Sequence, residues 1–262
     1  MMLVREFDSI VALGFRDVLK FVRDPRRIVA TFIFPIIFIG VLGGSLQANL
    51  GEDIGYNFLL FTFIGVLTQT LFQSTAAGII SLTEDRENDF AQEVFVSPIS
   101  RYGIIMGKIL GESVVAFLQT IGIVLFGVLT GVPIDFGRFG LLLILVPIIC
   151  FFGGSFGVFV VSQLGGARST REIFPFVIFP QFFLAGVFNP IVQLPLVLSV
   201  LSYLAPMRYA VDLLRGAYYW GRPEYPEVVA MSPLFNFVVL ILLTTLFMVV
   251  GTWVFVKKET NR

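Results

Sequence analysis

Residues 139–167 read FGLLLILVPIICFFGGSFGVFVVSQLGGA, and none of their side chains carries a charge. A helix needs about 20 predominantly apolar residues to cross the hydrocarbon core of a bilayer, so this stretch is long enough to span one. The rest of the 262-residue chain has the same character, because 56% of it is hydrophobic and only 14% is charged. Ordinary soluble domains carry about 25% charged residues. The sequence therefore predicts an all-α membrane protein.

Five more uncharged runs accompany this stretch. They cover residues 28–51, 54–83, 113–134, 173–207 and 228–256. We expect the helix of 113–134 to begin earlier, near Ile104, so that Lys108 and Glu112 lie in its first turns. Together the runs predict six membrane-spanning helices, an even number that returns the chain to the side where it began.

The run at 173–207 is too long and too often interrupted for one straight helix. Its prolines are Pro175, Pro180, Pro190, Pro195 and Pro206. We expect a span that ends near Phe188, a break at Asn189 and Pro190, and two short helices at about 193–204 and 207–219. Non-helical backbone at membrane depth is tolerated only where protein or water covers it. The helix pair between spans five and six is therefore expected to form a re-entrant or extracytoplasmic cap.

The distribution of basic residues predicts which way the chain faces. The chain has 18 Lys and Arg residues, and all but four fall in segments on the side of the two termini. The four on the opposite side are Arg138, Arg208, Arg215 and Arg222. Cytoplasmic segments carry the excess of Lys and Arg. We therefore expect a multi-pass protein of the cytoplasmic (inner) membrane, with both termini cytoplasmic.

The first residues have the pattern of an amphipathic helix. Apolar residues recur there at helical spacing, at Leu3, Phe7, Ile10, Val11, Val18 and Val22. We expect this helix to lie in the membrane interface, with packing against protein as the alternative. Pro25 ends it, and the segment is too long and too charged to be the start of a signal peptide. The predicted organisation is an interfacial helix at 1–27, a six-span domain at 28–256 and a cytoplasmic tail at 257–262.

One connection between spans departs from the apolar pattern. It reads SLTEDRENDFAQEVFVSPISRYGIIMGK at 81–108, and its acids are Glu84, Asp85, Glu87, Asp89 and Glu93. Asp89, with Gln92 three residues later, is expected to cap a short helix over 90–96, and Pro98 ends it. The apolar strip of that helix consists of Phe90, Ala91, Val94 and Phe95. Such a strip suits docking into a groove on another protein, or folding back onto the membrane domain.

This segment resembles the cytoplasmic coupling helix of ABC-2 type transporter permeases, the membrane subunits of daunorubicin-resistance and nodulation exporters. The family joins two spans by an Arg-Glu pair, a short helix, a Ser-Pro and a Gly-Lys. Here these are Arg86-Glu87, 90–96, Ser97-Pro98 and Gly107-Lys108, while Asn88-Asp89 stands where a Gly-Thr or Gly-Ser is common. A second match, at 205–219, places a Pro, an aromatic residue, an Asp and an Arg at helical spacing. They are Pro206, Tyr209, Asp212 and Arg215.

The resemblance implies the permease subunit of an exporter, in which two such chains, here expected to be identical, form the pathway among membrane lipids. A separate cytoplasmic ATPase would bind ATP and magnesium, so this chain needs no cofactor or metal of its own. The residues implied in ATPase coupling are Glu84, Arg86, Glu87, Asp89, Phe90, Val94, Phe95, Ser97 and Pro98. An amphiphilic or hydrophobic cargo, such as a drug, lipid or glycolipid, is expected because the spans are apolar and rich in Phe. The zero net charge gives no indication of nucleic-acid binding.

The chain itself has no phosphate-binding loop of the form G-x-x-x-x-G-K-[ST]. The nearest string, GIIMGKI at 103–109, has one residue too few between its glycines and lacks the Ser or Thr. The chain also has no His and a single Cys, Cys150, so neither a disulfide framework nor a zinc cluster is expected. Two other functions stay open: a membrane-embedded enzyme acting on a lipid carrier, and an ATP-independent channel or scaffold subunit.

Polar residues within the spans are further candidates. We expect Glu112 to pair with Lys108 one turn earlier, although an ionisable group in a span is also a candidate for transport. Arg208, Asp212 and Arg215 share a helix face and predict a charge ladder, either structural or in contact with an anionic head group. Other polar residues are expected to face protein or a water-filled path. They are Gln69, Gln73, Ser74, Thr75, Ser155, Ser162 and Gln163.

Overall fold

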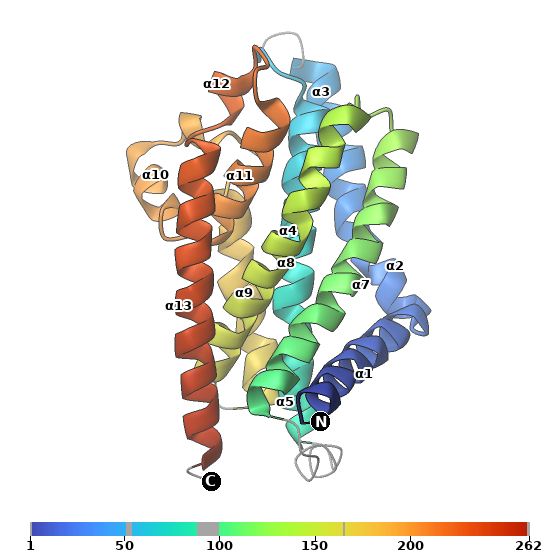
Figure 1. Ribbon diagram of the computed structural model, residues 1–262. Coiled ribbons are helices and arrows are strands. Elements are labelled where there is room, and N and C mark those ends of the chain that lie inside the picture. The colour runs from blue at the N-terminus through green and yellow to red at the C-terminus, as the bar shows by residue number, and fades with distance from the viewer. Residues whose placement is uncertain (1, 51–53, 88–99, 165, 261–262) are drawn as a thin grey trace.

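The computed structural model of the protein describes residues 2–50, 54–87, 100–164 and 166–260. Every element in these ranges is helical. In chain order they are α1 (Met2–Val22), α2 (Pro25–Pro35), the π-helix η1 (Ile36–Gly43), α3 (Gly44–Leu50), α4 (Phe58–Gly78), α5 (Ile80–Glu87), α7 (Arg101–Leu129), α8 (Phe136–Gln163), α9 (Ala167–Leu184), the 3₁₀ turn η2 (Ile191–Gln193), α10 (Leu196–Ser202), α11 (Met207–Tyr219), α12 (Tyr225–Val228) and α13 (Pro233–Thr260). The helices form an elongated bundle, in which α1 and the last residues of α13 lie at the same end (Figure 1).

The predicted all-helical, multi-pass architecture is confirmed. Among the described residues, five helical segments are long and apolar enough to cross a membrane. They are Pro25–Asn49, Phe58–Glu84, Tyr102–Leu129, Phe136–Gln163 and Tyr225–Lys258. The count is six if α10 and α11, which meet at a bend of 95°, are taken as one span. α9 falls outside the five because Arg168, Arg171 and Glu172 occupy its first turns, so its uncharged part runs only from Ile173 to Leu184.

Most predicted boundaries agree with the structure. α7 begins at Arg101, close to the expected Ile104, and carries Lys108 and Glu112 in its first turns. Asp24 caps α2 by accepting a hydrogen bond from the Arg27 N–H at 3.1 Å, and Pro25 occupies the first helical position. Since Pro is preorganised for that position, the chain turns there from α1 into the first span.

The fifth run needs a correction. α9 starts before the predicted residue 173 and ends at Leu184, not near Phe188. The break lies at Gly186, whose φ of 74° is in the left-handed region that favours glycine. The prolines at 175 and 180 lie within the helix, which is instead closed by hydrogen bonds from the N–H groups of Gly186 and Val187 to its last turn. The two short helices that follow are confirmed, and α11 has the predicted bounds 207–219.

The core is built around α4. Nearly all of its side chains from Phe58 to Phe72 are buried, and it packs on α7, α8 and α11. Aromatic rings fill the contact with α8, where the Phe72 centroid lies 5.3 Å from Phe152 and 5.2 Å from Phe156. Outer helices instead expose apolar stripes, as α13 does at Leu234, Val238, Leu242, Val249 and Trp253. Such stripes suit contact with lipid, whereas in water they would promote aggregation.

Candidate functional site

α5 and the first turns of α7 lie at the end of the bundle where α1 begins and α13 ends (Figure 1). The predicted helix over 90–96 lies outside the described residues. So do Asp89, Phe90, Val94, Phe95, Ser97 and Pro98, while Arg86 and Glu87 are the last residues of α5. Beyond the segment, Ser100 caps α7 by accepting a hydrogen bond from the Gly103 N–H at 3.0 Å. The segment therefore joins directly to a helix that continues through the bundle.

Glu84 is the acid of this segment whose side-chain contact is described. Its Oε1 lies 2.8 Å from Nε of Arg171, near the start of α9. Both side chains are partly exposed, at 34% and 64%, so solvent screens the pair and its contribution to stability is small. The contact nevertheless places the end of α5 beside α9, two segments far apart in the sequence.

Four charged side chains, which we call the four-charge network, join α1, α2 and α7; three of them are buried, and the fourth, Arg27, is 38% exposed. Lys108 on α7 lies 2.8 Å from Asp17 on α1 and 3.2 Å from Glu112 one turn further along α7. Glu112 also accepts a hydrogen bond from Nη2 of Arg27, in the first turn of α2, at 3.1 Å. The predicted Lys108–Glu112 pair is thus confirmed, and Asp17 and Arg27 from other helices extend it. Nη2 of Arg16 also lies 3.6 Å from Oδ1 of Asp17.

Because most of this network is buried, the stability of the fold depends on keeping its charges paired. The side chains of Asp17, Lys108 and Glu112 are only 1–5% exposed. Removing one charge from such a set leaves another charge buried without compensation, which is strongly destabilising. The Lys108–Asp17 contact has the distance of an ion pair but not the alignment of a hydrogen bond. The i,i+4 spacing along α7 predicted the first pair, but nothing in the local sequence predicts contacts to other helices.

A close approach of two backbones brings α1 onto α7. A Cβ placed on Gly111 would lie 2.7 Å from Cα of Gly14 and 2.9 Å from its carbonyl oxygen. Such distances are too short for any side chain, so the crossing requires glycine at 111. The buried face of α1 thus packs on protein, while Val11, Phe15 and Val22 are more than half exposed. The helix therefore packs on protein along one face and keeps an exposed apolar face on the other.

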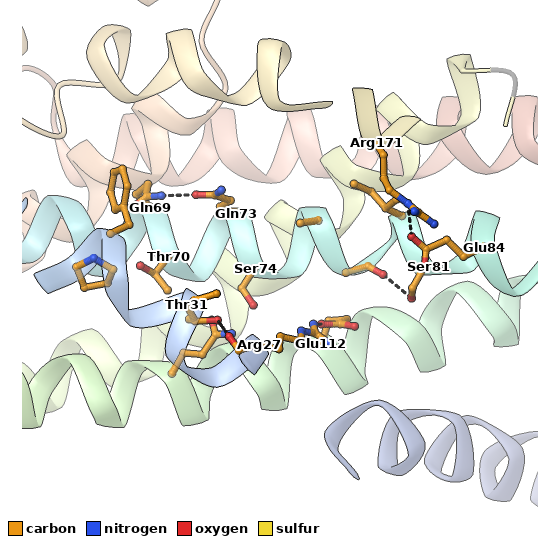
Figure 2. Close-up of a pocket in the computed structure, with 17 residues that line it drawn as sticks. Arg27, Thr31, Gln69, Thr70, Gln73, Ser74, Ser81, Glu84, Glu112 and Arg171 are labelled. Carbon is orange, nitrogen blue, oxygen red and sulfur yellow. Dashed lines mark hydrogen bonds and ion pairs between the residues drawn. The ribbon is translucent and has the colours of Figure 1, made fainter. Parts of the chain in front are cut away.

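A pocket of about 480 Å³ opens beside the network, between α2, α4, α5, α7 and the start of α9. Its uncharged polar lining includes Thr31, Gln69, Thr70, Gln73, Ser74 and Gln119. Figure 2 shows Gln69, Gln73 and Ser74 following one another along α4 toward Ser81 and Glu84. Arg27 and Glu112 lie across from them. The volume is within the range of roughly 300–1,000 Å³ that is typical of small-molecule sites.

The predicted polar residues of the spans divide into two groups. Gln69, Gln73 and Ser74 line this pocket, as expected of residues that face a path through the protein. Ser155 and Ser162 instead donate hydrogen bonds to carbonyls of their own helix, each at 2.7 Å. The sequence interpretation missed Thr31 and Gln119, although Gln119 lies two helical turns beyond Glu112 and so on the same face of α7.

The predicted ladder of Arg208, Asp212 and Arg215, which we call the α11 cluster, is wrong in its contacts. All three side chains are buried, but among the described residues neither arginine lies within ion-pair distance of Asp212. Arg215 donates to the carbonyls of Gly186 (2.6 Å), Val187 (3.1 Å) and Phe61 (3.3 Å). Its guanidinium also lies over the Phe61 ring, 3.5 Å from the centroid. It therefore fixes the break after α9 instead of pairing along its own helix.

The other two members of the cluster bind the segments that precede and follow α11. Asp212 accepts hydrogen bonds from the N–H groups of Ala230 and Met231, both at 2.9 Å, and from the Asn236 amide at 2.7 Å. Arg208 donates to the Ser202 hydroxyl and lies over the Tyr203 ring. These contacts hold α10, α11 and the start of α13 together. They favour the structural role over contact with a head group.

Asp135 caps α8 in the loop that follows α7. Its Oδ1 accepts hydrogen bonds from the N–H groups of Arg138 (3.3 Å) and Gly137 (3.0 Å). Its Oδ2 lies 3.3 Å from Nη2 of Arg222. The hydrogen bond from the Arg138 N–H, assisted by those from Arg222 and Gly137, holds the pKa of the Asp135 carboxyl below its ordinary value of 3.8.

The glycine-lysine string at 103–109 lies within α7, so it forms no phosphate-binding loop. Its lysine is Lys108, which is engaged in the four-charge network.

Comparison with known proteins agrees with this architecture. Residues 8–219 match the family model described as ABC-2 type transporter. The chain is 24% identical over 205 residues to a putative transport permease ycf38 of Cyanophora paradoxa, covering 75% of this chain and 69% of that protein. It is 26% identical over 223 residues to the Pyropia yezoensis protein of the same name, covering 80% and 74%. It is 23% identical over 198 residues to nodulation protein J of Neorhizobium galegae, covering 74% of each. With most of its length matched, and with an all-helical bundle of apolar spans, the chain belongs to the ABC-2 type transporter family.

Proposed function

We propose that this chain is the transmembrane permease subunit of an ATP-driven exporter that moves an amphiphilic or hydrophobic cargo out of the cytoplasm. The family match over residues 8–219 is the observation that carries the proposal. In this proposal both termini are cytoplasmic, in an inner membrane, and a second, identical chain completes the pathway. ATP and magnesium are bound by a separate ATPase subunit, which hydrolyses the ATP.

The ATPase docks on the segment around Phe90 and Phe95, and Glu84, Arg86, Glu87, Asp89, Val94, Ser97 and Pro98 shape that surface. Support comes from what the segment joins. Beyond it, α7 starts at a capped residue and reaches Lys108 and Glu112 within its first turns. Glu112 and Arg27 line the pocket, and Lys108 ties the same turn of α7 to α1. A displacement of the segment is therefore transmitted along α7 to one wall of the pocket.

The test is affinity purification of the tagged chain in mild detergent, from cells that express it with its native partners. We expect a soluble partner with a phosphate-binding loop, in a ratio of one per permease chain. We expect the partner to be lost in Phe90→Asp and in Phe95→Asp, because a charge in an apolar docking strip has no partner in the groove. Phe136→Asp is the matched control, since Phe136 is 65% exposed and the start of α8 lies at the opposite end of the bundle from α5 (Figure 1).

Undiminished association in both docking variants would exclude the docking role. A homo-oligomer without any ATPase would favour an ATP-independent channel or an enzyme acting on a lipid carrier.

A further inference from the structure

We infer that the pocket beside the four-charge network binds the uncharged, hydroxyl-bearing head group of an amphiphilic cargo. This inference rests on the proposed function, because it names the class of molecule that the permease moves. It is carried by three features of the pocket: two buried amide oxygens without partners, the balance of its charges, and its apolar end.

The unpartnered oxygens are the first feature. Within the described part of the chain, the buried side-chain amide oxygens that lack a hydrogen-bond partner are Oε1 of Gln69 and Oε1 of Gln119. They belong to different helices, α4 and α7, yet both residues line this pocket. Both side chains are at least 97% buried. Because a buried acceptor without a donor is unfavourable, this wall is stabilised by any ligand that brings hydrogen-bond donors.

The pocket's charges are the second feature. Its two arginines and two acids are matched one to one, Arg27 with Glu112 and Arg171 with Glu84. Glu112 is further neutralised by Lys108. Each charged side chain of the lining thus already has an ion-pair partner, so a charged head group would have to compete with one of these pairs while losing its own hydration. A hydroxyl group carries no such penalty, and it both donates and accepts hydrogen bonds.

The apolar end is the third feature. Arg27, Thr31 and Phe34 lie on one face of α2, at spacings of four and three residues, and all line the pocket together with Pro35. Phe34 lies about 10 Å further along the helix axis than Arg27. The neighbouring Ile33, Ile36 and Ile37 are about half exposed on the bundle's apolar surface. A cargo that places its head group between Gln69 and Gln119 thus has an apolar path for its chain.

The experiment measures binding of tritiated hexyl β-glucoside to nanodiscs that carry the chain alone, after subtraction of empty nanodiscs. Unlabelled hexyl phosphate and hexyltrimethylammonium, which have the same chain and a charged head, are the competitors. We expect saturable binding that neither charged amphiphile displaces. In the double variant Gln69→Leu/Gln119→Leu the dissociation constant should rise at least about tenfold, because both acceptors are lost.

Gln163→Leu is the matched control. It replaces an exposed glutamine at the end of α8, away from the pocket, and should bind like the wild type. If the double variant does not elute as a folded protein, the two single variants are measured, and each should weaken binding. Native mass spectrometry of each variant follows its oligomeric state.

Four results would overturn the inference. The first is binding no greater than that of empty nanodiscs, and the second is equal displacement by the charged amphiphiles. The third is wild-type affinity in the glutamine variants. The fourth is a glutamine variant that differs from the wild type only in its oligomeric state. The measurement uses no ATPase, so its failure leaves the exporter assignment in place. Failure of ATPase association, in turn, leaves the binding result in place.

Discussion

The α11 cluster is buried, and so are three of the four side chains of the four-charge network, but the two sets of charges have different kinds of partner. In the network, side chains of opposite charge from α1, α2 and α7 lie 2.8–3.2 Å apart. In the cluster, Arg215 and Asp212 bind backbone carbonyls and N–H groups of distant loops. The network thus joins regular helices to one another, whereas the cluster satisfies backbone where the helices end.

The difference follows from what each helix faces. Asp17, Lys108 and Glu112 lie inside α1 and α7, whose backbone groups are already bonded there, so a buried charge needs a charged partner. The turn at Gly186 and the residues before α13 leave carbonyls and N–H groups that need partners. A buried guanidinium or carboxylate can supply several hydrogen bonds at once to such a site.

The largest effect is expected at Arg215. Arg215→Met should lower the free energy of unfolding by about 3–5 kcal/mol, because three carbonyls lose a charged donor inside the protein. Thermal unfolding in detergent measures the effect. Arg168→Met is the control, since the Arg168 side chain is 93% exposed and its pair with Glu172 contributes under about 0.5 kcal/mol. Equal stability of the two variants would mean that the buried contacts of Arg215 do not stabilise the fold.

Lys108→Met should come next, with a loss of about 2–4 kcal/mol, since it leaves Asp17 and Glu112 with fewer cations in a buried site. The double variant Asp17→Asn/Lys108→Met removes one charge of each sign and leaves Glu112 with Arg27. Its loss should be smaller than the sum of the two single losses, as for residues in one network. Strict additivity in thermal unfolding would mean that the network is not a unit.

A smaller effect is expected at the crossing of α1 and α7. Gly111→Ala should push α1 away at a loss of about 1–3 kcal/mol, because its Cβ would lie 2.7 Å from Cα of Gly14. The same substitution on the other side of the crossing, Gly14→Ala, is the control, since its Cβ would have its closest contact at 3.4 Å. Limited proteolysis within α1 should be faster in Gly111→Ala alone. Equal cleavage of both variants would contradict the close crossing.

The smallest effect is expected at Asp135, a charge outside both sets. Its lowered pKa means that the ionised form is favoured by folding, so its contribution is present above the ordinary value of 3.8 and is lost as the pH falls below it. The melting temperature of Asp135→Asn should therefore lie further below that of the wild type at pH 6 than at pH 3. A difference that does not change with pH would show that the cap acts without its charge.

The sequence predicted what depends on local pattern. The apolar runs predicted the helical, membrane-spanning class, the i,i+4 spacing predicted the Lys108–Glu112 pair, and Pro206 predicted the start of α11. What it missed depends on contacts across the bundle. Nothing near Asp17 or Arg27 in sequence indicates Lys108 and Glu112 as partners. Gln119 became a candidate for the lining of the pocket only because the structure places α4 beside α7. The ladder was predicted wrongly because helical spacing does not reveal unsatisfied carbonyls at a distant break.

The most direct test of the exporter assignment is the ATP hydrolysis rate of the co-purified ATPase, measured alone and with the chain in nanodiscs. We expect that the chain changes this rate and that Phe90→Asp leaves the ATPase at the rate it has alone. A hydrolysis rate unaffected by the wild-type chain, with both proteins present in the nanodisc at equal amounts, would contradict the exporter assignment.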